Sequence, residues 1–367
     1  MPVLSQSQGV LDAGTLQCLT QGTAAEAWRC IIERTLDIAS RPLAEGNAPG
    51  EVVKRDREIG KLDLFLASSG WDLWQSFGQP EVSGVERTSD RLARWWAEPG
   101  YGNSAARAVL ILDALSLREL PWLLQGAKER GFTVQGVTAT ASELPGETNE
   151  FARALGLASR SQLQANGSGF GQPKAGPKGE PQGRGEHTLQ PVQTETIDLP
   201  WKDCEGLVKN APGAKNWLFW HHWPDARLHD YGAGQGLELL TRDASQQLSS
   251  NDFWAFVERL ATGRRLVITS DHGYAATGYF PDADGEVAAY LKQTFASGRS
   301  KADKGDTGPF VPPVALQIDS PHGPHLLALG RRKWKSQGGY PTLTHGGLSL
   351  LEVLSPFVEI SKNQGSL

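Results

Sequence analysis

Short apolar runs alternate with amphipathic stretches along the chain from residue 106 onward. Aliphatic and aromatic residues fill the runs 106–113, 132–139, 216–223 and 264–271, whereas 116–131 and 236–263 repeat their apolar positions at helical spacing. Strands separated by helices in this way are typical of a parallel sheet. The pattern therefore predicts an α/β fold with a mainly parallel sheet and helices on both of its faces.

The first hundred residues show a different pattern. Apolar residues recur at helical spacing in 23–40, 61–77 and 90–100, and no cluster of titratable groups accompanies them. We interpret residues 1–104 as a small helical accessory region and residues 105–362 as the main domain. A chain of 367 residues is long enough for one large domain with such an appendage.

Two stretches are predicted as loops. Residues 161–195 are rich in Gly, Pro and Gln and lack hydrophobic periodicity, which is typical of a flexible insertion. Because the insertion would emerge near the carboxyl ends of the strands, a lid is one interpretation, but a tolerated surface insertion is the more common case. A second mobile loop is expected over residues 297–310.

Composition limits the function classes. A net charge of -5 provides no global attraction to nucleic acid or to an anionic membrane, so such binding would need a local patch. No apolar run is long enough to span a membrane, and the start of the chain does not resemble a secretory signal. The three cysteines, Cys18, Cys30 and Cys204, are scattered. We expect a cytoplasmic protein without structural disulfides.

Carboxylates stand where three of these segments end. Asp113 and Asp271 directly follow apolar runs, and Asp225 comes just after a third. Ligands bind beyond the carboxyl ends of the strands in such sheets. His272 follows Asp271, and both could reach one point only where the backbone leaves its strand, since neighbouring strand residues face opposite ways. Gly273 would permit that turn.

Histidines extend this group. His229 lies four residues after Asp225, so one helical turn would place both on one face, and His345 precedes a pair of glycines and the run 348–360, at an expected loop-to-helix junction. We interpret His221 and His222 as satisfied core residues instead. Clustered carboxylate and imidazole groups can bind a divalent metal that activates an oxygen nucleophile.

Five motifs in this order resemble the alkaline phosphatase superfamily and, within it, the PglZ domain. They are LILDALSLREL around Asp113, ELPGETNEFARALG around Thr148, WHHWPDARLHD around Asp225, ITSDHG around Asp271 and the final THGGLSLLEVLSPFV. The resemblance covers roughly residues 105–360, and the first hundred residues have no match. It implies an alkaline-phosphatase-like catalytic domain over residues 105–362.

The resemblance also implies a division of labour among the residues. One metal would be held by Asp113, Thr148, Asp271 and His272, and the other by Asp225, His229 and His345. Zinc is the expected metal, because it suits mixed carboxylate and imidazole ligands, while Mn²⁺ or Mg²⁺ would suit carboxylates. Thr148 would be the nucleophile, and Ser116 is a lower-ranked rival that stands where a helix cap is expected.

Several neighbouring residues bear on this interpretation. Thr148 could instead cap the following helix, a role compatible with an exposed hydroxyl. Glu147 departs from expectation, because its charge would repel an anionic substrate unless it faces solvent or pairs with a base. Asn149, by contrast, could donate a hydrogen bond to a substrate oxygen.

A basic segment lies shortly before His345 and contains Arg331, Arg332, Lys333 and Trp334. It is either a solvated face or a contact with the substrate, in which the tryptophan could stack on a base. Lys174, Lys178 and Arg184 could add to that contact.

The sequence thus indicates a metal-dependent phosphohydrolase. The resemblance implies a phosphodiesterase that acts on a nucleotide or nucleic acid, within bacterial phage defence of the BREX kind or in signalling. The alternatives are a phosphomonoesterase or other ester hydrolase on the same scaffold, and a non-catalytic scaffold subunit of a defence complex. No CxPxR-like motif stands at Thr148, which argues against a sulfatase.

Overall fold

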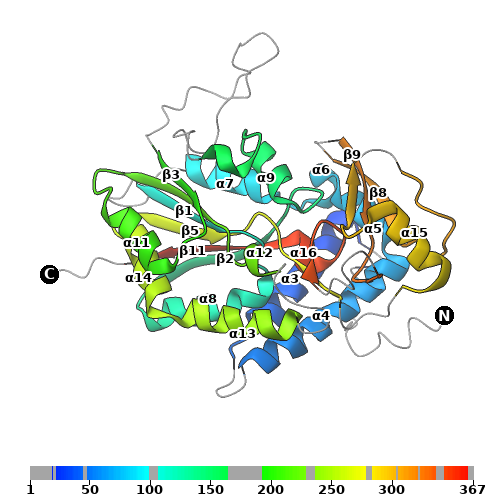
Figure 1. The fold of residues 1–367 in the computed structure, drawn as a ribbon, viewed down its shortest axis with the longest axis horizontal. Helices are drawn as coiled ribbons and strands as arrows, with labels where there is room; N and C mark the ends of the chain where they lie inside the picture. Colours follow the sequence, from blue (N-terminus) through cyan, green and yellow to red (C-terminus); the bar gives the residue numbers. More distant parts are fainter. Residues whose placement is uncertain are drawn as a thin grey trace, which may run out of the picture.

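The computed structural model describes residues 19, 22–43, 48–98, 106–163, 192–228, 236–277, 283–302, 305–320, 323–335 and 343–362. At its centre lies a six-stranded sheet in the order β2–β11–β5–β1–β4–β3 (Figure 1). In chain order the strands are β1 (Arg107–Leu112), β2 (Thr133–Ala141), β3 (Val192–Ile197), β4 (Asn216–His221), β5 (Arg265–Thr269) and β11 (Leu354–Ser361).

Parallel pairing dominates this sheet. β1 pairs in parallel with β4 and β5, and β4 pairs in parallel with β3, whereas β11 runs antiparallel to both β5 and β2. All of β4 and all but the first residue of β1 and β5 are buried. Such continuous burial is expected of parallel strands covered on both faces. The predicted mainly parallel α/β sheet is confirmed.

Helices cover both faces of the sheet, each over its own apolar core (Figure 1). Ala108 and Leu110 of β1 belong to one core cluster, and their neighbours Val109 and Ile111 belong to another. Successive strand residues point to opposite faces, which explains this division. The first face is covered by α8 (Leu120–Glu129), α11 (Trp201–Lys209), α13 (Gly236–Ser249) and α14 (Asn251–Ala261), and the second by α7 (Thr88–Ala97) and α9 (Thr148–Ala154).

Two of the predicted helices differ from the observed elements. The stretch 236–263 forms two helices, because Ser250 caps α14 by accepting a hydrogen bond from the Phe253 N–H at 3.1 Å. The run 348–360, expected to be helical after His345, is helical only in α16 (Leu350–Val353) and continues as β11. A short apolar run buried on both faces has no periodicity that distinguishes a strand from a helix.

The N-terminal helices share the apolar core of the first face. Trp28 and Trp74 lie with their ring centroids 5.1 Å apart, and both belong to the cluster that contains Leu110 of the central strand. The helices before α7 are α3 (Ala24–Ser40), α4 (Ala48–Ser69), α5 (Trp71–Phe77) and α6 (Pro80–Ser83). Helix α4 also packs against α13, so the helical region and the sheet enclose one continuous interior.

The cysteines correct one expectation. Cys30 on α3 is disulfide-bonded, whereas Cys204 on α11 is buried and free. The expectation of a chain without structural disulfides is therefore wrong at Cys30.

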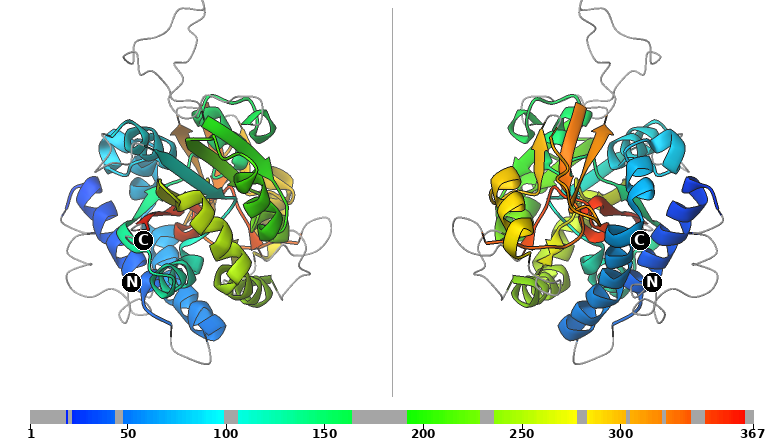
Figure 2. Two further views of the ribbon diagram at one scale, coloured as in Figure 1. Left: turned by 90° about the vertical axis from the view of Figure 1, so that its left-hand side faces the viewer. Right: turned by 90° about the vertical axis from the view of Figure 1, so that its right-hand side faces the viewer.

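A smaller sheet stands beside the main one, in the order β7–β9–β8. Its strands are β7 (Ser300–Ala302), β8 (Ala315–Ser320) and β9 (Gly323–Ala328), and α15 (Gly285–Phe295) packs next to it. In the right-hand view of Figure 2, α15 (gold) and the N-terminal helices (blue) lie on opposite sides of the orange strands. The loop predicted over 297–310 therefore contains β7, while residues 303–304 lie outside the described residues.

The predicted insertion is described only at its ends. Residues 160–162 form a short 3-10 helix, η2 (Arg160–Gln162), and β3 begins at Val192, so the end of the predicted 161–195 loop is a strand. Residues 164–191, with Lys174, Lys178 and Arg184, lie outside the described residues. Within the described ranges, no helix has both the length and the apolar character needed to cross a membrane.

Candidate metal centre

Two neighbouring strands deliver the first carboxylates. Asp113 directly follows β1, and Asp271 comes two residues after the last residue of β5. These two strands pair in parallel, so their carboxyl ends meet at the same edge of the sheet. Both side chains are buried, as is His272. One ligand atom from each of these three residues lies within 4.8 Å of the other two. The strand-end carboxylates therefore converge with an imidazole at one point.

Local backbone geometry turns His272 toward the carboxylates. Its ring Nδ1 lies 2.9 Å from the carbonyl oxygen of Gly273, which leaves Nε2 to face Asp271 Oδ2 at 3.5 Å. Gly273 is required here, because a Cβ at this position would collide with the carbonyl oxygen of Leu351. The sharp turn expected after Asp271 thus brings adjacent side chains to one point.

The donor atoms at this point fit a divalent cation. Asp271 Oδ2 is buried and has no hydrogen-bond partner among the described residues, whereas Oδ1 accepts from the N–H groups of Ala114 and His272 at 3.0 Å each. Leaving a carboxylate oxygen buried without a partner is costly. Zinc accepts carboxylate oxygen and imidazole nitrogen together, and a histidine that holds a metal usually has its other ring nitrogen fixed by a carbonyl.

Thr148 lies beside this group. Its Oγ1 is 3.3 Å and 3.5 Å from the two carboxylate oxygens of Asp113 and 3.5 Å from His272 Nε2. Thr148 is the first residue of α9, and the cap residue is Glu147, so the alternative that Thr148 itself caps the helix is wrong. The half-buried hydroxyl instead faces the carboxylate and imidazole groups.

A second pair of potential ligands adjoins the first group. His345 Nε2 lies 3.6 Å from Asp225 Oδ1, and the His345 ring stacks on His272 with centroids 4.4 Å apart. Desolvation and the neighbouring His272 ring lower the pKa of His345, which favours the neutral imidazole that a metal requires. Its Nδ1 lies 3.1 Å from the carbonyl oxygen of Gly146. His229 lies outside the described residues.

Arg160 is a residue of this site that the sequence analysis missed. From η2 its Nη1 forms an ion pair with Asp113 Oδ2, and its guanidinium carbon lies 5.9 Å from the centroid of the Trp220 ring. Partial burial lowers the pKa of Arg160, while the carboxylates of Asp271 and Asp225 oppose that shift. A single arginine in a polar loop carries no local signal, so only the fold reveals its place.

Ser116, the rival nucleophile, has a structural role. It is fully buried and caps η1 (Leu117–Glu119), where its Oγ accepts from the Arg118 N–H and Glu119 Oε2 accepts from the Ser116 N–H at 2.8 Å. Its Oγ also lies 3.3 Å from the Leu351 carbonyl oxygen. The expected cap is confirmed, and a hydroxyl so enclosed cannot meet a substrate.

Of the two histidines interpreted as core residues, His221 is buried and His222 is only half-buried. His221 is buried, its Nδ1 accepts from the Trp223 N–H at 3.0 Å, and its Nε2 lies 2.8 Å from the Leu199 carbonyl oxygen. Burial lowers the pKa of His221 to about 4, so it is neutral at physiological pH. His222 is half-buried, with Nε2 3.2 Å from Thr196 Oγ1.

The basic segment is not a stacking surface. Trp334 is buried and donates its indole N–H to the Ala296 carbonyl oxygen at 2.8 Å, and Arg331 is buried in ion pairs. The predicted substrate contacts at these two residues are therefore wrong, because neither side chain is accessible. Arg332 and Lys333 are half-buried.

The other neighbours of Thr148 are more accessible. Asn149 is exposed on the first turn of α9, and Glu147 is half-buried and accepts a hydrogen bond from the Ser300 hydroxyl. This partner of Glu147 is a neutral hydroxyl rather than a base, so it does not offset the charge that would repel an anionic substrate.

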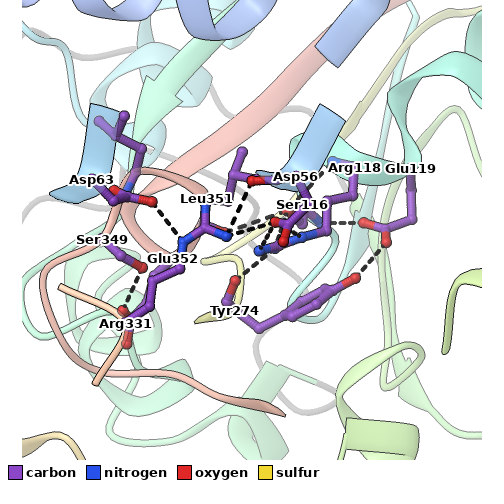
Figure 3. A network of polar contacts seen from close by, with 11 residues as sticks. Asp56, Asp63, Ser116, Arg118, Glu119, Tyr274, Arg331, Ser349, Leu351 and Glu352 are labelled. Carbon is purple, nitrogen blue, oxygen red and sulfur yellow. Dashed lines mark hydrogen bonds and ion pairs between the residues drawn. The ribbon is translucent and has the colours of Figure 1, made fainter. Parts of the chain in front are cut away.

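Buried charges brace the loops that carry the potential ligands (Figure 3). Asp56 of α4 accepts from Arg118 and from Arg331 at 2.8 and 2.7 Å, and Asp63 accepts from Arg331 at 2.6 Å. Arg118 also donates to the Tyr274 carbonyl oxygen at 2.6 Å. A helix of the N-terminal region therefore ties together the loops that follow β1 and β5.

We expect Glu119 to make stability depend on pH. Burial raises the pKa of Glu119 to about 7 from an ordinary 4.5, although Tyr274 and Arg118 oppose the shift. Between these pH values the folded protein holds a proton that the unfolded chain has released. The free energy of unfolding should therefore fall as the pH rises through this window, on the order of 3 kcal/mol.

Urea titrations between pH 4.5 and 8 would measure this effect, with Glu119→Gln as the comparison. The glutamine can still bond both Tyr274 and Ser116 but does not titrate. The stability of the wild type relative to this variant should decline with rising pH up to about 7 and then level off. Parallel profiles would contradict the assignment.

Comparisons with known proteins identify no close relative. No family model matches the chain, and no curated protein matches its sequence. Among solved structures, murine ectonucleotide pyrophosphatase/phosphodiesterase 5 is similar with a TM-score of 0.43 and 11% identity, over 69% of this chain and 87% of that chain. An inactive form of it in complex with AMP gives a TM-score of 0.43 and 12% identity with the same coverage.

Phosphonoacetate hydrolase from Sinorhizobium meliloti 1021, in complex with phosphonoformate, is also similar. Its TM-score is 0.41 and its identity 13%, over 71% of this chain and 91% of that chain. Both neighbours belong to the alkaline phosphatase superfamily. None of the comparisons shows a PglZ domain.

Proposed function

We propose that this chain is a metal-dependent phosphohydrolase of the alkaline phosphatase superfamily, with a PglZ-like catalytic domain over residues 105–362. One observation carries the proposal: Thr148 Oγ1 lies 3.3 Å from Asp113 Oδ1, within a group in which Asp113, Asp271 and His272 can hold a metal. A hydroxyl beside such a group is the arrangement that activates an oxygen nucleophile.

We assign the ligands as the sequence motifs imply. Asp113, Asp271, His272 and Thr148 would hold one ion, and Asp225, His345 and His229 the other, with zinc the best match to these donors. The stacked rings of His272 and His345, 4.4 Å apart between centroids, support two adjacent positions. When bound, such ions lower the pKa of an oxygen nucleophile and offset charge on a phosphoryl group.

Thr148 is the residue that reacts. Its Oγ1 attacks phosphorus in line as the bond to the leaving oxygen breaks, the hydroxyl proton passes to solvent, and the leaving oxygen takes up a proton from water. A water molecule then attacks the phosphothreonine, the P–Oγ1 bond breaks, and Thr148 regains its proton. Helix α9 begins at Thr148 and holds this hydroxyl toward Asp113, Asp271 and His272, which we call the ligand group.

The finer assignment is a phosphodiesterase that acts on a nucleotide or nucleic acid within a BREX-like defence complex. It rests on the PglZ-like motifs around Asp113, Thr148, Asp225 and Asp271. As part of this proposal the protein acts in the cytoplasm.

Metal removal tests the proposal directly. Dialysis against EDTA should abolish hydrolysis of a chromogenic phosphodiester, and stoichiometric zinc should restore it, because the ligand group cannot activate Thr148 alone. Parallel assays with a phosphomonoester and a sulfate ester would define the substrate class. Full zinc occupancy, measured by elemental analysis, without turnover of any of the three esters would refute the proposed activity.

A further inference from the structure

Arg160 links the protein surface to a fully buried carboxylate of the site. Its side chain is 24% exposed, whereas that of Asp113, its ion-pair partner, is 0% exposed. Arg160 opens η2, six residues after the end of α9, and so belongs to the same chain segment as Thr148. The Arg160 side chain is therefore partly exposed to solvent, while its guanidinium group reaches the buried carboxylate of Asp113.

The guanidinium and the nucleophile share one oxygen atom. Arg160 Nη1 pairs with Asp113 Oδ2, and Thr148 Oγ1 lies 3.5 Å from that same Oδ2. A phosphoryl group joined to Thr148 would therefore form within reach of the guanidinium. Arginine presents a planar set of donors that matches phosphate oxygens, and it stays charged even when partly buried.

The ion pair also conflicts with occupancy of the site. A cation held by Asp113 must approach its carboxylate oxygens closely, and a guanidinium on Oδ2 competes for the same charge and the same space. The nearby carboxylates of Asp225 and Asp271 would be neutralised by the same cations. Arg160 would then lose its anionic partner and become available to another.

We infer that Arg160 exchanges partners: it neutralises Asp113 when the ligand group holds no cation and binds the phosphoryl oxygens of the substrate when the group is filled. The inference rests on the proposed function and deepens it, since it names the residue that recognises the phosphoryl oxyanion. The centroid of the Trp220 ring lies 5.9 Å from the guanidinium carbon, so this ring provides a face against which the Arg160 side chain rests during the exchange.

The exchange predicts effects of opposite sign on two ligands. Arg160→Ala should bind zinc about tenfold more tightly, because a competing cation is gone, and should bind inorganic phosphate roughly 10- to 100-fold more weakly, because a charge-assisted contact is lost. Arg160→Lys should be intermediate for phosphate, since an ammonium keeps the charge without the planar donors. Competition with a chromogenic chelator measures zinc, and calorimetry on the zinc-loaded protein measures phosphate.

Arg153→Ala is the matched control. Arg153 lies on α9, pairs with Glu150 and has a 53% exposed side chain outside the ligand group. Its loss should leave both affinities unchanged. If Arg160→Ala weakened both ligands, or neither changed, Arg160 would be a structural tether of η2 and the inference would be overturned. A wild-type protein that binds no zinc would instead refute the proposed function itself.

Discussion

Thr148→Ala is expected to lower turnover of a phosphodiester by at least about 10³-fold, because the alcohol that attacks phosphorus is removed. Zinc should still bind, since Asp113, Asp271 and His272 retain their donor atoms. Steady-state kinetics with metal content measured on the same sample would test both statements. Single-turnover experiments with wild-type protein should also trap phosphate on Thr148.

Thr148→Ser provides the matched control for this experiment. Serine retains the hydroxyl at the first position of α9 and should keep most of the activity, with loss only of the methyl group that restricts its rotamer. Unchanged turnover in Thr148→Ala would exclude Thr148 as the nucleophile. Loss of hydrolysis with intact biological function would instead favour the scaffold alternative.

Asp56→Asn is expected to destabilise the protein by about 3–5 kcal/mol, which is the usual cost of removing one partner from a buried ion pair. Asp56 faces Arg118 and Arg331, and all three side chains are essentially inaccessible to solvent. Asn keeps the shape but leaves two buried guanidinium groups with less compensating charge. Urea denaturation at pH 7 measures the change in the free energy of unfolding.

An exposed ion pair of α13 serves as the control. Glu238 pairs with Arg242, with side chains 64% and 62% exposed, so Glu238→Gln should cost at most about 0.5 kcal/mol. A similar small effect for Asp56→Asn would show that the network in Figure 3 does not brace the molecule. A large effect would make α4 an integral support of the loops that carry the potential ligands.

Much of the sheet and part of the site could be predicted from local patterns. The runs before Asp113 and Asp271 became β1 and β5, because continuous burial on both faces selects unbroken apolar sequence. The final apolar run, by contrast, became β11 rather than a helix, since β5 and β2 on either side supply its hydrogen bonds. Nothing in its own composition required that outcome.

The polar residues divide in the same way. Asp113 and Asp271 could be placed together because parallel strands that pair must end at the same edge. Trp334 and Arg331 looked like a basic, aromatic surface, yet Arg331 meets Asp56 across 275 positions of sequence. A charge run in the sequence does not reveal whether a distant carboxylate neutralises it.

The chain by itself determined four of the six strands of the main sheet, the helices that follow them and the carboxylates at the strand ends, because these depend on local burial patterns and on the direction of each strand. Tertiary structure alone decided the partners of Arg160, Arg331 and Glu119. The energy of a charged group depends on burial and on charges brought near by folding, and neither quantity is encoded in its neighbours along the chain.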